Sequence, residues 1–134
     1  MKLEYSNANA LLYEKFDEMK KAYDEDKDGY DDTPHCFYSL EFVPYILKHL
    51  QENSEKELKK IFDFVEQLMS SCDIYLINLA EVSIIEPLYF DDVNIDHKAA
   101  MLKYGGKLTL QSFIDCFDDE EMAGWEKTES SLMH

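Results

Sequence analysis

Apolar residues recur at three- and four-residue steps along most of this 134-residue chain, which is the spacing of amphipathic helices. The clearest stripe lies in the middle of the chain and contains Leu58, Ile61, Phe62, Val65, Leu68 and Met69. Ser54 and Glu57 stand ahead of this stripe at the spacing of a capping box, in which each side chain accepts the other residue's backbone amide. The pattern predicts a helix that begins after Ser54 and ends near Met69.

The next segment, Ile74 to Glu86, is apolar on almost every side. A helix with this composition is a buried one, and its length favours a helix over the alternative, a buried strand. Asp73 is placed to cap its first turn. We expect Pro87 to end the helix, because proline disfavours helical geometry in the residue before it.

Further helices are predicted on both sides of this centre. Helical spacing relates Cys36, Leu40, Val43, Leu47 and Leu50 in one segment and Leu12, Phe16, Met19 and Tyr23 in another, Ser6 to Tyr23, which Asn7 or Asn9 can cap. Pro44 falls inside the first of these and should kink or divide it, at a cost of about 3 kcal/mol unless packing compensates.

Two more helices are expected towards the C-terminus. One begins after Asn94 and ends at Gly105-Gly106, where left-handed geometry is available, and one runs from Thr109 to Phe117. We expect Trp125 to fold back onto the bundle and the tail from residue 126 to 134 to fray. The chain is therefore predicted to be one all-α domain, residues 1–134, with central helices at about 36–87. About six antiparallel helices would form an irregular stack, either a bundle or a short α-solenoid.

The charge of the chain is extreme. There are 29 acidic residues against 13 basic ones, which gives a net charge of −16, and every basic residue is a lysine. A field this negative repels nucleic acid and anionic membranes and accelerates encounter with a cationic protein. The composition therefore argues against nucleic-acid binding and favours a partner with a basic surface.

Cellular location is predicted from the cysteines and from the absence of targeting segments. Cys36, Cys72 and Cys116 are far apart and odd in number, so we expect them to be reduced, buried and cytoplasmic. The first residues contain no apolar signal core, and no apolar run approaches the ~18 residues that a membrane span requires.

The sharpest local motif is acidic. Asp24, Asp26, Asp28 and Gly29 match the first half of an EF-hand calcium loop, but His35 stands where that loop needs a bidentate glutamate. Three interpretations stay open for this segment: a weak calcium site, a plain acidic loop, and a contact surface for a basic partner.

Catalytic motifs are missing from the sequence. There is no glycine-rich phosphate loop and no HExxH, and the neighbours His35 and Cys36 point in different directions on a helix. Asp91, Asp92 and His97, with Asp96, could surround a metal, but a capped helix start explains the same residues. We therefore predict a binding protein that is not an enzyme and has no cofactor and no metal.

Three motifs resemble a family of small, all-helical bacterial proteins that are similar to toxin-immunity proteins, including those of contact-dependent growth inhibition. These motifs are Pro34-His35, Ile61-Phe62-Asp63-Phe64-Val65-Glu66 and Asn78-Leu79-Ala80-Glu81-Val82-Ser83-Ile84-Ile85-Glu86. Pro87 departs from the usual ending of the third motif. The resemblance implies an immunity protein that neutralises a basic toxin domain, such as a nuclease, without catalysis.

Acidic side chains and flanking aromatic residues are the predicted partner-binding residues, because carboxylates can substitute for phosphates and aromatic residues dominate interface energetics. They are Asp24, Asp26, Asp28, Tyr30, Asp31, Asp32, Tyr89, Asp91, Asp92, Asp118, Asp119, Glu120 and Glu121. A calcium-responsive module and a helical adaptor are the alternative functions. The oligomeric state is left open by the sequence.

Overall fold

The computed structural model describes residues 1–90, 99–100 and 103–116, and all regular structure in these ranges is helical. The predicted all-α fold class is confirmed. In chain order the elements are η1 (Tyr5–Asn7), α1 (Ala8–Lys15), α2 (Asp17–Glu25), α3 (Lys27–Tyr30), α4 (Pro34–Phe37), η2 (Tyr38–Phe42), α5 (Val43–Glu52), α6 (Glu55–Met69), α7 (Ile74–Ala80), η3 (Glu81–Ile85) and α8 (Glu86–Phe90), followed by helical residues 103–104 and 107–116.

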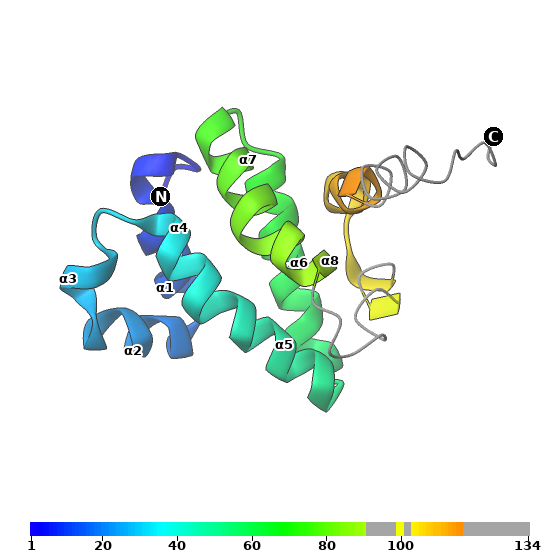
Figure 1. The fold of residues 1–134 in the computed structure, drawn as a ribbon, viewed down its shortest axis with the longest axis horizontal. Coiled ribbons are helices and arrows are strands. Elements are labelled where there is room, and N and C mark those ends of the chain that lie inside the picture. Colours follow the sequence, from blue (N-terminus) through cyan, green and yellow to red (C-terminus); the bar gives the residue numbers. More distant parts are fainter. Residues whose placement is uncertain (91–98, 101–102, 117–134) are drawn as a thin grey trace, which may run out of the picture.

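Two continuous helical segments, which we call rods, dominate the arrangement. The elements α4, η2 and α5 run on without a break, and so do α7, η3 and α8, while α6 lies between the two rods in the chain (Figure 1). The short helices α1, α2 and α3 gather beside the start of the first rod. Within the part of the chain that is described, no helix is long and apolar enough to cross a membrane.

Both rods contain a π-helical segment just ahead of a proline. The backbone amide of Val43 donates to the carbonyl of Tyr38, and the amide of Glu86 donates to the carbonyl of Glu81, each five residues back. Pro44 and Pro87 follow these two residues directly. The wider turn removes the need for the α-type hydrogen bond that proline cannot donate. The prediction that Pro87 ends its helix is therefore wrong, and of the two outcomes predicted for Pro44, a kink or a division, the division does not occur.

The π-helical turns also change which side chains are buried. Leu40 and Cys36 were expected in the buried stripe, yet Leu40 is 62% exposed and Cys36 is also exposed. The buried face contains Phe37, Tyr38 and Phe42, all fully covered, and also Val43 of the predicted stripe. An extra residue in the turn rotates the helix face, so a stripe extrapolated at α-helical spacing selects the wrong residues.

The core is built around an aromatic cluster that joins three parts of the chain. The ring of Phe16 lies 5.2 Å from that of Phe42 and 5.5 Å from that of Phe64, measured between centroids. The buried Tyr38 hydroxyl donates to the carbonyl of Ala8 at 2.7 Å and ties η2 to α1. The apolar stripe predicted for residues 58–69 is buried throughout, as expected.

Several local expectations fail for identifiable reasons. The first helix is broken at Phe16, whose backbone is extended at φ −128° and ψ 118°. The helix after Asp73 was predicted to be buried, but the side chains of Ile74 and Tyr75 at its start are 71% and 67% exposed. Cys72 is also exposed rather than buried. None of the described glycines has a positive φ, so Gly105-Gly106 does not adopt the left-handed geometry that was expected at that position.

Candidate functional site

An acidic segment covers the end of α2, all of α3 and the two residues after it, residues 24–32, which we call the acidic corner. It contains six acidic residues and one lysine, and every acidic side chain in it is exposed. They are Asp24, Glu25, Asp26, Asp28, Asp31 and Asp32. The predicted acidic contact residues in this segment are therefore all exposed.

The buried side chain of Tyr30 attaches the acidic corner to the core of the protein. Its side chain is 6% exposed, and its hydroxyl donates to Glu41 Oε2 at 2.6 Å. The side chain of Asn9 donates to the Tyr30 carbonyl at 2.8 Å. The hydrogen bond to Glu41, then burial, raises the pKa of Tyr30 to about 12.

A second tyrosine fixes one of the carboxylates. The Tyr23 hydroxyl donates to Asp31 Oδ1, and this hydrogen bond, followed by burial, raises the pKa of Tyr23 to about 12. Asp24 makes an ion pair with Lys20 at 3.0 Å. These contacts leave Glu25, Asp26, Asp28 and Asp32 as the exposed carboxylates of the corner that have no ion pair or hydrogen bond to another side chain among the described residues.

The half EF-hand loop is not formed. Asp24 belongs to α2, whereas Asp28 and Gly29 belong to α3, so helical turns replace the calcium-binding loop. No group of three potential metal ligands comes together in the described residues. The geometry gives the calcium interpretation no support.

Tyr30 and Tyr89 were predicted to be aromatic contact residues for a partner, but neither is exposed. Tyr30 is buried, and Tyr89 is 2% exposed, because it lies in α8 and not in a loop. The rings of Tyr89 and Phe113 lie 5.0 Å apart, so Tyr89 packs against helix 107–116. Both tyrosines support the fold. The other predicted contact residues, Asp91, Asp92, Asp118, Asp119, Glu120 and Glu121, lie outside the described residues, as do Asp96 and His97.

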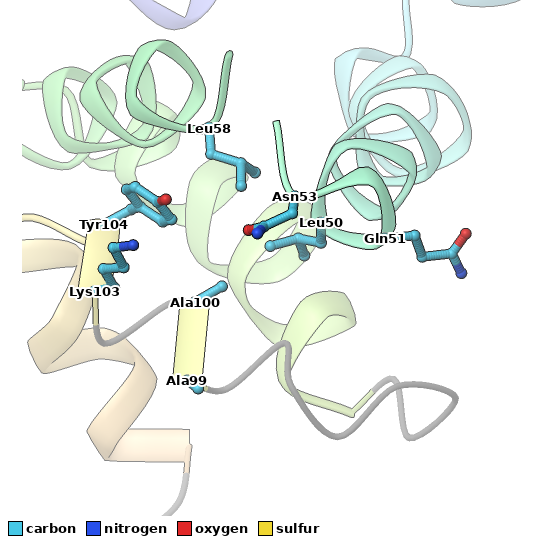
Figure 2. A pocket seen from close by; sticks show the side chains of 8 residues that line it. All are labelled: Leu50, Gln51, Asn53, Leu58, Ala99, Ala100, Lys103 and Tyr104. Atoms are coloured by element: carbon cyan, nitrogen blue, oxygen red, sulfur yellow. The ribbon is translucent and has the colours of Figure 1, made fainter. Parts of the chain in front are cut away.

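A pocket of about 380 Å³ lies between the end of α5, the start of α6 and residues 99–100 and 103–104. Figure 2 shows its lining: Leu50, Gln51, Asn53, Leu58, Ala99, Ala100, Lys103 and Tyr104. The walls are mixed, partly apolar and partly polar, and the buried Tyr104 hydroxyl has no hydrogen-bond partner among the described residues. The described lining includes no carboxylate, histidine or thiol, and its ionisable side chains are Lys103 and Tyr104.

The family described as Domain of unknown function (DUF7674) matches residues 9–119. The chain belongs to this family. Comparison with curated proteins and with solved structures finds no match.

One histidine–serine pair in this DUF7674 domain has the composition of a catalytic dyad. His35 Nδ1 lies 2.7 Å from Ser83 Oγ and joins α4 to η3. Ser83 is only 3% exposed, however, so its hydroxyl is not accessible to a substrate. The pair links two helices across the middle of the domain, a contact between residues 48 positions apart that the sequence pattern did not indicate.

The sequence also missed the role of Glu66. Its carboxylate accepts the backbone amides of Leu108 and Thr109, each at 2.9 Å, and the Thr109 hydroxyl at 2.8 Å. Partial burial opposes ionisation, but these three hydrogen bonds outweigh it and lower the pKa of Glu66. Glu66 therefore caps helix 107–116 of the DUF7674 domain from α6.

Asp73 behaves as predicted and also makes a long-range contact. It accepts the backbone amide of Tyr75, in the first turn of α7, at 2.9 Å, and the amide of Tyr5 at 2.7 Å. The hydrogen bond from Tyr5 is the main cause that lowers the pKa of Asp73. The expected capping box at Ser54 is wrong, since Ser54 makes no side-chain cap and Glu57 accepts the Tyr45 hydroxyl instead.

Proposed function

We propose that this DUF7674 domain is a non-catalytic binding protein whose acidic corner docks onto a basic surface of a partner protein. The observation that carries the proposal is the corner itself, with six exposed acidic side chains within residues 24–32. The net charge of −16 extends the same field over the molecule and would steer a cationic partner towards it.

The way the corner is held supports a recognition role. Tyr30 inserts into the core, Asn9 binds its carbonyl, and the Thr33 hydroxyl donates to the Gly29 carbonyl at 2.9 Å. A segment that is already ordered loses little conformational entropy on binding, so more of the electrostatic attraction is expressed as affinity. A loosely attached acidic loop would lack this advantage.

The finer proposal is inhibition of a toxin domain. Nuclease active sites are basic because they hold phosphate, and Asp26, Asp28 and Asp32 could occupy such positions. Inhibition would then be steric and electrostatic. The motifs that resemble toxin-immunity proteins motivate this step, and the acidic corner is compatible with it.

The test is affinity capture from source cells with three forms of the chain. The first is the natural sequence, and the second carries Asp24→Asn, Asp26→Asn, Asp28→Asn and Asp32→Asn. The matched control neutralises as many exposed acids elsewhere, through Glu4→Gln, Glu14→Gln, Glu55→Gln and Glu86→Gln. We expect one basic protein to be retained by the natural form and the control and lost from the corner variant.

The association rate of the captured partner provides the second measurement. Raising salt from about 50 to about 300 mM should slow association about tenfold or more, because screening weakens long-range steering. An acidic partner, or equal capture by the corner variant and the control, would overturn the proposal. A captured basic protein whose enzymatic activity persists in the complex would overturn inhibition alone.

A further inference from the structure

A groove lined by lysines lies between the end of α1 and the outer face of α6. Its volume is about 710 Å³, and its lining contains Lys15, Lys56, Glu57, Lys59, Lys60, Asp63 and Gln67. Four of the 13 lysines of the chain therefore surround one hollow in a protein of net charge −16. The groove is a local reversal of the sign of the surface.

The lining of the groove carries four lysines and two carboxylates, so its net charge is positive. Among the residues that the structure describes, none of its four lysines makes an ion pair within 4.0 Å. Of its two acidic side chains, Glu57 already accepts the hydroxyl of Tyr45. Four neighbouring ammonium groups repel one another, so a multivalent anion placed among them would remove that repulsion.

The fold positions one of these lysines, Lys60, over an aromatic ring. The extended backbone at Phe16 ends α1, and Lys15 precedes that break directly. The Phe16 ring is 1% exposed and packed in the aromatic core, and Lys60 Nζ lies 4.9 Å from its centroid. This cation–π contact orients Lys60 at the groove. Three of the four lysines therefore lie on α6, and one of them contacts the buried ring of Phe16.

We propose that this groove binds a small anion carrying two or more linked phosphoryl groups. Lysine ammonium groups bind phosphate oxygens as point charges with three donors each, and the four lysines of the groove outnumber its two carboxylates. The volume lies in the range of small-molecule sites, about 300–1,000 Å³. A nucleic-acid polymer is disfavoured, because beyond the groove it would meet the negative field of the whole domain.

Calorimetry with inorganic pyrophosphate, at constant ionic strength set with sodium chloride, tests this site. We expect one saturable site with Kd below about 1 mM, which corresponds to about 4 kcal/mol of binding free energy. The groove variant combines Lys15→Gln, Lys56→Gln and Lys59→Gln and leaves Lys60 on its ring. The matched control changes three other exposed lysines, through Lys2→Gln, Lys21→Gln and Lys107→Gln.

Binding should weaken about tenfold or more in the groove variant and by less than about threefold in the control. Urea unfolding of each variant checks that the fold is intact. Absence of saturable binding at about 10 mM pyrophosphate, or equal loss in both variants, would overturn the proposal. Tripolyphosphate and ATP form two further arms. Tighter binding of ATP would identify a nucleoside triphosphate as the source of the phosphoryl groups, and equal binding would identify free polyphosphate.

Discussion

The carboxylate of Glu66 is the contact through which α6 holds the start of helix 107–116. It satisfies two backbone amides that the helix itself leaves without acceptors, and it also binds the Thr109 hydroxyl. A carboxylate at this end of a helix is favoured by the helix dipole as well. The contact joins residues more than 40 positions apart, so no local pattern around Glu66 could reveal it.

Glu66→Gln should destabilise the domain by about 1–2 kcal/mol at neutral pH, because an amide accepts these hydrogen bonds less strongly than a carboxylate. The pKa of Glu66 is lowered from 4.5, so its contribution is complete above that value and is lost as pH falls through the folded pKa. The stability difference between the two forms should therefore shrink below about pH 4. Urea unfolding at several pH values measures it.

Asp63→Asn serves as the control, since Asp63 is exposed on the same helix and the described residues offer it no ion pair. Gly106→Ala supplies a second check, because a Cβ there would lie 2.5 Å from Glu66 Cδ and displace the carboxylate. The effects of Gly106→Ala and Glu66→Gln should then be less than additive in the double variant. Full additivity, or a pH-independent difference, would contradict the capping role.

At the scale of elements, the two π-helical segments are the feature that most separates this fold from a simple helical stack. The segments η2 and η3 contact each other, and each precedes a proline. The bonds from Val43 to Tyr38 and from Glu86 to Glu81 span five residues. Each extra residue lets the rod continue past a proline while its apolar face stays on the core.

Deleting Leu40 should test this coupling, since its side chain is exposed and its removal would force η2 towards α-helical bonding. We expect a loss of about 3 kcal/mol or more, because Pro44 would then clash with the preceding turn. Adding Pro44→Ala to the deletion should recover most of that loss. Urea unfolding of the three variants measures the effect.

Pro44→Ala alone is the matched control, and it should change stability by less than about 1 kcal/mol, since the buried aromatic residues on either side still hold the π-helical register. If Pro44→Ala fails to rescue the deletion, the proline is not the reason that the wide turn is needed. A large effect of Pro44→Ala alone would also contradict the argument.

These elements show what the sequence could and could not predict. The stripe on α6 and the cap at Asp73 depend on neighbours within one helix, and both were predicted from the pattern. The exposure of Leu40 depends on a change of helical period, and Pro44 is the one residue nearby that indicates such a change. The positions of Tyr30 and Ser83 depend on partners 11 and 48 residues away, so periodicity could not supply them. Of the candidate site, the sequence located the acidic corner but not its buried support, and it missed the lysine groove.

At the scale of the molecule, the net charge of −16 should make the stability of the domain depend on salt. Crowded like charges destabilise a compact state, and exposed charges are screened within about 8–10 Å at moderate ionic strength. We expect the unfolding free energy to rise by on the order of 1 kcal/mol between about 10 and about 300 mM sodium chloride.

The acidic corner should contribute a measurable part of this self-repulsion. Asp26→Asn, Asp28→Asn and Asp32→Asn together should stabilise the domain at low salt, and the advantage should disappear at high salt, because these carboxylates face solvent and repel one another. Pyrophosphate at equal ionic strength should stabilise the natural chain further, because it binds in the lysine groove, whereas chloride only screens the charges. A corner variant less stable than the natural chain at low salt would show that these carboxylates support the fold. They would then not be free to meet a partner.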